Sequence, residues 1–120
     1  MNIIFLMKPL HTVDKNKDTS LLFMKACQFY NANLFFCPQN NASITSEGVV
    51  FNVQRFTCNE DDSSTIFSMY EHVSLNEVDV HSIFIRTDPP FDQRYLNDML
   101  ILEQVKSPIN FINNPKAIKD

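Results

Sequence analysis

The 120-residue sequence contains a single glycine, Gly48. Loops that hold a nucleotide phosphate, of the P-loop or dinucleotide-binding type, need several glycines because their backbone N–H groups must approach the anion closely. A chain with one glycine offers no such loop. The sequence therefore excludes the binding of ATP or NAD by these two devices.

Cysteines are few and irregularly spaced. The three cysteines, Cys27, Cys37 and Cys58, form an odd set with no Cys-x-x-Cys pair. This pattern disfavours both a disulfide framework and a zinc site. Cys27 falls in a helical apolar pattern and Cys37 ends a predicted strand, so we interpret the cysteines as small buried hydrophobes, with a reactive role as the alternative.

Basic runs and long apolar runs are also missing. The formal net charge is −4, from 10 basic and 14 acidic residues, which argues against a nucleic-acid partner. The apolar N-terminal run ends at Lys8, too early for a signal peptide or a membrane span, so we expect a cytoplasmic protein without membrane contact.

The acidic segment 59–64 fits no calcium loop, although its carboxylates leave a metal role as an alternative. The three histidines, His11, His72 and His81, are scattered along the sequence. No nucleophile is arranged near them, which disfavours a catalytic histidine.

The first third of the chain predicts a strand–helix–strand unit. Residues 2–7 form a continuous apolar run, typical of a strand buried on both faces. A largely buried helix should begin at 18–20, where Asp, Thr or Ser can each cap it, and end before asparagines at 31–33. Residues 34–37 predict the next strand, so the two strands should pair in parallel.

Shorter elements follow. Residues 42–45 and 49–56, joined by Ser-Glu-Gly, predict an antiparallel hairpin at the sheet edge. Residues 65–70 fit either a short strand or a helical turn, and residues 75–79 predict a helical turn before a strand at 80–86.

Two more elements complete the chain. The pattern predicts a helix from Gln93 to about Lys106, with one apolar face that includes Leu96 and Leu100. A last strand is expected at 109–112, which gives an α/β fold with a mostly parallel sheet.

The most distinctive stretch is 83–92, where a buried strand ends in Arg86 and a rigid polar turn follows. Pro89 and Pro90 block both strand and helix continuation. Asp92 stands where the N-cap of the next helix belongs. A polar turn between a buried strand and a helix is where α/β proteins place ligand sites.

Candidate ligand residues lie at this edge. The guanidinium of Arg86 can grip a substrate carboxylate, or it can form a salt bridge with Asp88 or Asp92 that fixes the turn. Asp88 can orient Arg86 or a substrate amine, or it can be purely structural. Thr19 and Ser20 lie at a helix N-terminus that suits an anionic group, although capping alone explains both residues.

These residues resemble a known family. Residues 86–92, Arg-Thr-Asp-Pro-Pro-Phe-Asp, resemble the Arg-x-Asp-Pro-Pro-Phe-Asp signature of bacterial glutathione synthetase. Residues 17–20 are similar to the Lys-Asp-Ser-Ser that opens the first helix of that family, and residues 113–120 are similar to the segment that leads into its ATP-grasp region. The resemblance covers all 120 residues in order.

The resemblance implies that residues 1–120 form one N-terminal, pre-ATP-grasp domain, a Rossmann-like three-layer α/β/α fold on the substrate side of the enzyme. The family ligates γ-glutamylcysteine and glycine through an acyl phosphate, as homotetramers. The resemblance also implies ATP and Mg²⁺ as cofactors of the full-length enzyme, bound in ATP-grasp domains that this chain lacks. The chain looks cut at Asp120, so we expect no cofactor here and no activity from this chain alone.

Two alternatives remain. The chain can instead be a non-catalytic binding or assembly module derived from that domain. A phosphoacceptor receiver domain is a weaker hypothesis, because residues 7–9, Met-Lys-Pro, lack the acidic pair that such a domain needs after its first strand.

Overall fold

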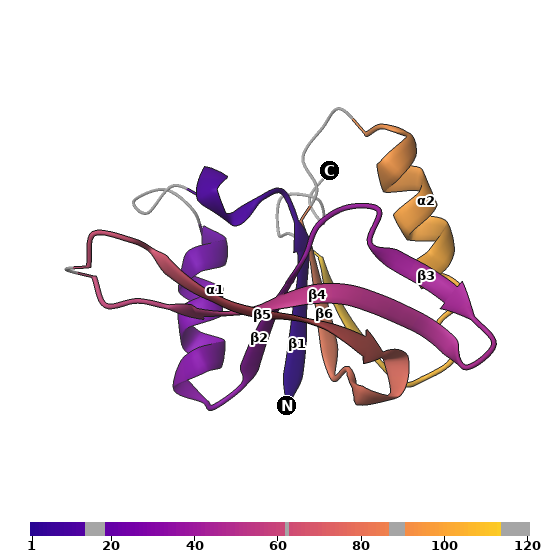
Figure 1. The fold of residues 1–120 in the computed structure, drawn as a ribbon, viewed down its shortest axis with the longest axis horizontal. Helices are drawn as coiled ribbons and strands as arrows, with labels where there is room; N and C mark the ends of the chain where they lie inside the picture. Colours follow the sequence, from indigo (N-terminus) through magenta and orange to yellow (C-terminus); the bar gives the residue numbers. More distant parts are fainter. Residues whose placement is uncertain (14–18, 62, 87–90, 114–120) are drawn as a thin grey trace.

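The computed structural model describes residues 1–13, 19–61, 63–86 and 91–113. Within these ranges one seven-stranded sheet is flanked by two α-helices (Figure 1). The strands are β1 (Asn2–Met7), β2 (Asn33–Cys37), β3 (Ala42–Thr45), β4 (Gly48–Cys58), β5 (Phe67–Asn76), β6 (Ser82–Arg86) and β7 (Asn110–Asn113). The helices are α1 (Thr19–Phe29) and α2 (Gln93–Leu102), with 3-10 turns η1 (Leu10–Thr12) and η2 (Glu77–Asp79).

The centre of the sheet is parallel, in the order β2-β1-β6-β7. Residues 3–7 of β1 are all buried, as expected for a strand covered on both faces. The chain passes from β1 through α1 to β2, which confirms the predicted parallel unit. It passes from β6 through α2 to β7 in the opposite direction along the sheet. The strand order therefore reverses between β1 and β6.

The other part of the sheet is antiparallel and larger than the predicted hairpin. β3 and β4 form that hairpin, and β5 adds a further antiparallel strand to β4. Residues 67–70 belong to β5, which settles the choice between strand and helical turn in favour of the strand. Leu75 and Asn76 were predicted to be helical, but they lie in β5 because Leu75 pairs with Phe51 across the strands. The α/β prediction is confirmed, with as many antiparallel as parallel strand pairings in the described chain.

The two helices cover opposite faces of the sheet (Figure 1). Leu21 and Met24 of α1 pack into the core that contains Phe5 and Phe84. Leu102 of α2 packs into the second core, which includes residues of β1, β2, β4 and β6. This arrangement confirms the three layers. No helix in the described ranges has the length and apolar character needed to cross a lipid bilayer.

The prediction that α1 is largely buried is wrong. Only Ser20, Leu21 and Met24 are buried, whereas Leu22 and Phe29 are 71% and 78% exposed. The helix lies on a single face of the sheet, so its opposite side remains uncovered although it is apolar.

The prediction that α2 extends to about Lys106 is also wrong. The helix ends at Leu102, and the N–H groups of Lys106 and Ser107 each donate to Glu77 Oε1 at 2.8 Å. A buried carboxylate therefore takes the two N–H groups that a longer helix would have used.

The predicted apolar face of α2 points away from the core. Leu96 and Leu100 are 51% and 59% exposed, whereas Asp98 and Leu102 are buried. The helix is rotated so that a carboxylate, rather than these leucines, lies against the sheet.

Candidate functional site

The point where the strand order reverses defines the candidate site. Arg86 ends β6 and pairs in register with Met7, which ends β1. Ligands of open α/β sheets bind at the carboxyl ends of the strands next to such a reversal, because the flanking helices diverge there. The structure therefore places Arg86, predicted to lie at the carboxyl edge, at the switch point itself.

A hydrogen bond connects Arg86 with the first turn of α1. Arg86 Nη1 donates to Ser20 Oγ at 2.6 Å, although the two residues are 66 positions apart. Ser20 is buried, at 2% exposed, whereas Thr19, the first residue of α1, is exposed. A guanidinium is thus held at the positive end of a helix, an arrangement that favours an anionic group nearby. The predicted Asp88, Pro89 and Pro90 lie outside the described residues.

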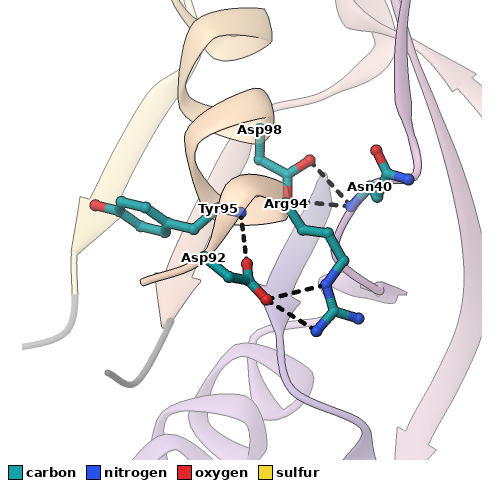
Figure 2. Close-up of polar contacts among 5 residues, drawn as sticks. All are labelled: Asn40, Asp92, Arg94, Tyr95 and Asp98. Atoms are coloured by element: carbon teal, nitrogen blue, oxygen red, sulfur yellow. Dashed lines mark hydrogen bonds and ion pairs between the residues drawn. The ribbon is translucent and has the colours of Figure 1, made fainter. Parts of the chain in front are cut away.

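Asp92 is the N-cap of α2, as the sequence predicts (Figure 2). Its Oδ1 accepts the N–H of Tyr95 at 3.2 Å, and its Oδ2 accepts from Nε and Nη2 of Arg94 at 3.2 and 3.0 Å. The hydrogen bond from the Arg94 guanidinium and, to a smaller extent, the one from the Tyr95 N–H hold the pKa of Asp92 below its usual value. Asp92, one of the two acids considered as a salt-bridge partner of Arg86, therefore forms its ion pair with Arg94.

A second carboxylate of α2 was missed from the sequence. Both oxygens of Asp98 accept the backbone N–H of Asn40, at 3.0 and 3.2 Å, so that α2 holds the turn that follows β2 (Figure 2). Asp98 is 1% exposed, and burial raises the pKa of its carboxyl group, although the hydrogen bond from Asn40 opposes this shift. Its position four residues before the buried Leu102 was the available signal.

Glu77 was also missed, and it lies at the opposite edge of the parallel strands, just before β6. Its carboxylate accepts three backbone N–H groups: Val49 on Oε2 at 2.7 Å, and Lys106 and Ser107 on Oε1 at 2.8 Å. These hydrogen bonds lower the pKa of Glu77 to about 2, and the bond from Val49 contributes most to this shift. Gly48 has a φ of +105°, and a Cβ there would lie 2.9 Å from Glu77 Oε2. Glu77 is therefore a structural clamp, since its carboxylate binds backbone N–H groups from two separate segments of the chain.

Cys37 and Cys58 match their prediction as buried hydrophobes, whereas Cys27 is only half-buried. All three are free, and burial raises the pKa of Cys37 to about 12 and that of Cys58 to about 11. Thiols with such pKa values stay protonated and unreactive at neutral pH. His81 Nδ1 lies 2.6 Å from Ser82 Oγ, but Ser82 is only 4% exposed, so its hydroxyl is inaccessible to a substrate.

The described residues show no glycine-rich phosphate loop. Gly48 is the first residue of β4 and lies against the Glu77 carboxylate, which would repel a phosphate. Across ranges 1–13, 19–61, 63–86 and 91–113 no group of three His, Cys, Asp or Glu side chains is placed to hold a metal ion.

Comparisons with known proteins agree with the sequence resemblance. The family model described as "Prokaryotic glutathione synthetase, N-terminal domain" matches residues 1–119. Curated relatives include the glutathione synthetases of Wigglesworthia glossinidia brevipalpis, 29% identical over 117 residues, and of Anaplasma centrale, 31% identical over 105 residues. That of Pseudomonas aeruginosa is 29% identical over 117 residues.

These relatives are much longer than this chain. The alignments cover 96%, 87% and 95% of the chain, but only 36%, 32% and 36% of the three relatives in the same order. The chain thus spans about a third of each relative.

Proposed function

The chain belongs to the prokaryotic glutathione synthetase N-terminal domain family, and from this membership we propose that it forms the substrate-side domain of an ATP-dependent ligase that joins γ-glutamylcysteine to glycine. The matching relatives carry the name glutathione synthetase. In this proposal, the chain contributes the N-terminal domain of an enzyme with that activity.

One observation supports the substrate-side role most directly, namely the Arg86 guanidinium at the switch point, hydrogen-bonded to Ser20. Both substrates of the proposed ligase carry carboxylates, and a guanidinium binds a carboxylate with good geometry. In this proposal Arg86 contacts a carboxylate of γ-glutamylcysteine, Ser20 orients the guanidinium, and Thr19 lies at the exposed start of α1. The sequence also assigns Asp88 to this proposed site, with Pro89, Pro90 and Asp92 as structural residues beside it in the chain.

Phosphoryl chemistry is assigned to other domains. In this proposal ATP and Mg²⁺, which the family implies for the full-length enzyme, are bound by its ATP-grasp part. The domain contributes part of the surface that binds and orients a substrate. In keeping with the family resemblance, we also propose a cytoplasmic homo-oligomer.

An assay of ADP release with γ-glutamylcysteine, glycine and Mg-ATP tests the function. The 120-residue chain should show no turnover, whereas a chain joined to the remaining two thirds of a relative such as the Pseudomonas aeruginosa enzyme should release ADP and form glutathione. Turnover by the 120-residue chain alone would contradict the proposal that substrate binding and phosphoryl transfer belong to different domains. A correctly folded chimera that binds neither substrate would favour a non-catalytic module.

A further inference from the structure

A pocket of about 280 Å³ lies where β4 and β5 extend past β2, and it is termed the amide pocket. Three side-chain amides, a serine, a histidine and a half-buried phenylalanine line it: Asn41, Asn52, Gln54, Ser74, His72 and Phe36. Among the described residues that line it, none is Asp, Glu, Lys or Arg. The pocket therefore suits a neutral polar group that donates and accepts hydrogen bonds, rather than a phosphate or a metal ion.

Strand register explains the polar lining. Gln54 pairs with Phe36 of β2 and with His72 of β5, and Asn52 pairs with Ser74. Directly paired residues point to the same face of a sheet. Two positions after Gln54 on that face, β4 enters the core that α1 covers. The strand thus continues beyond the helix with polar side chains on an open surface.

The turn after β2 forms a wall of the pocket and is held from two sides. It contributes Pro38 and Asn41 to the lining. The N–H of Asn40 donates to both oxygens of the buried Asp98, and the carbonyl of Asn41 accepts the N–H of Asn52 at 2.8 Å. A wall fixed in this way reduces the ordering that a ligand must impose when it binds.

The amide pocket and Arg86 lie on the same face of the sheet. Phe5 pairs with both Phe36 and Phe84, so the three share a face. Met7 and Arg86, two residues further along their strands, point to that face as well. Only β1 separates β2 from β6, and neighbouring strands are about 4.8 Å apart, so the carboxyl ends of β2 and β6 lie about 10 Å from one another.

Two amide atoms in the pocket remain available to a ligand. Asn52 Oδ1 accepts from Ser74 Oγ at 3.0 Å, and Gln54 Nε2 donates to the carbonyl of Tyr70 at 3.0 Å. In the described part of the chain these are the hydrogen bonds of the two side chains, which leaves the Asn52 NH₂ group as a donor and Gln54 Oε1 as an acceptor. A donor and an acceptor side by side on one face match the C=O and the N–H of a peptide bond.

We propose that the amide pocket binds the peptide bond and the thiol of γ-glutamylcysteine, while Arg86 binds a carboxylate of the same molecule. This inference rests on the proposed function. An extended dipeptide spans about 7 Å, and the γ linkage adds two methylene groups, so the ligand is long enough to reach both places. Asn52 and Gln54 hold the peptide bond. The ring of Phe36 contacts the thiol, because sulfur packs favourably against aromatic rings.

An NMR titration of the isotope-labelled 120-residue chain with γ-glutamylcysteine tests the pocket without catalysis. Backbone signals of residues 52–54 and 72–74 should shift, and Asn52→Ala should weaken binding about fivefold, the effect of one neutral hydrogen bond. Ser43→Ala, at an exposed position of β3 outside the pocket, is the matched control and should leave the affinity unchanged. Shifts around Arg86 without shifts in 52–54 and 72–74 would overturn the inference and leave the carboxylate site of the proposed function standing.

The KM of the chimera for two dipeptides tests the contact with the thiol. The wild type should prefer γ-glutamylcysteine to γ-glutamylalanine, which lacks only the sulfur atom, and Phe36→Leu should reduce this preference about twofold or more. An unchanged preference in the folded variant, or an unchanged KM in Asn52→Ala, would overturn the inference while the ligase activity stands. A folded chimera that makes no glutathione, although the 120-residue chain binds the dipeptide in the pocket, would instead reject the proposed function.

Discussion

The two edges of the parallel sheet each contain a buried carboxylate, and the two behave in opposite ways. Glu77, at the amino edge, has its pKa lowered to about 2. Asp98, near the carboxyl edge, has its pKa raised. Their exposed fractions are similar, 3% and 1%, so burial alone does not explain the difference.

Different interactions dominate at the two groups. At Glu77 the hydrogen bonds from three backbone N–H groups, in two separate segments, favour the charged form. At Asp98 desolvation dominates, and the single N–H of Asn40 offsets it only in part. Glu77 therefore joins two segments at the amino edge through a charged group, whereas Asp98 connects α2 with the turn after β2.

The largest expected effect is that of Glu77→Gln. The amide would turn an NH₂ group toward at least one of the three backbone N–H donors and would remove the charge that they bind, so the free energy of unfolding should fall by about 3 kcal/mol. Urea unfolding measures this loss. Glu47→Gln, at an exposed position in the turn just before Gly48, is the matched control and should change little. A loss below about 1 kcal/mol for Glu77→Gln would show that the clamp matters little.

The same carboxylate should give the chain an acid-sensitive stability. Because the folded-state pKa of Glu77 lies below its ordinary value of 4.5, its contribution is complete above about pH 4.5 and is lost as the pH falls toward about 2. Asp98, with a raised pKa, has the opposite sign, since its protonation favours the folded chain. Urea unfolding from pH 7 to pH 2 should therefore show a steeper acid loss for the wild type than for Glu77→Gln, and equal slopes would contradict this assignment.

Asp92→Ala should have a smaller effect at the carboxyl edge. Loss of an N-cap typically costs about 1 kcal/mol. Asp92→Asn is the control, because asparagine also caps helices, and it should recover most of the loss while removing the ion pair with Arg94. Equal losses in the two variants, measured by thermal or urea unfolding, would assign the effect to the ion pair instead.

The smallest effect is expected for Asp98→Asn, which should cost less than about 1 kcal/mol. The amide keeps one acceptor for the Asn40 N–H and removes the desolvation cost that raises the pKa of the acid. Asp79→Asn, at an exposed site, controls for the loss of one negative charge. A loss as large as that of Glu77→Gln would remove the contrast between the two edges.

The sequence was sufficient for the features that local chemistry determines. Continuous apolar runs predicted the parallel strands, the Glu-Gly turn predicted the β3–β4 hairpin, and Asp92 was recognisable as a cap. It was insufficient for Glu77 and Asp98, because a polar residue that points inward has the same local pattern as one that points to solvent. The bonds from Lys106 and Ser107 to Glu77 also explain why the end of α2 was predicted too late.

The candidate site was predictable only in part. The position of Arg86 at a strand end followed from the apolar run before it, but its hydrogen bond to Ser20 depends on how β6 lies against β1. The burial of α1 was overestimated because apolar residues on the exposed face of a helix follow the same periodicity as those that face the core.

The most direct test of the central proposal, that the carboxyl edge binds substrate through Arg86, is the KM for γ-glutamylcysteine of the chimera that joins this chain to the remaining two thirds of the Pseudomonas aeruginosa enzyme. Arg86→Lys keeps the charge but loses the two-pronged geometry, so this KM should rise about tenfold, which corresponds to one charged hydrogen bond of about 1.4 kcal/mol. Arg94→Lys, in the neighbouring exposed ion pair, should leave the KM unchanged. An unchanged KM for Arg86→Lys in a folded enzyme would contradict the account and leave Arg86 as a purely structural residue.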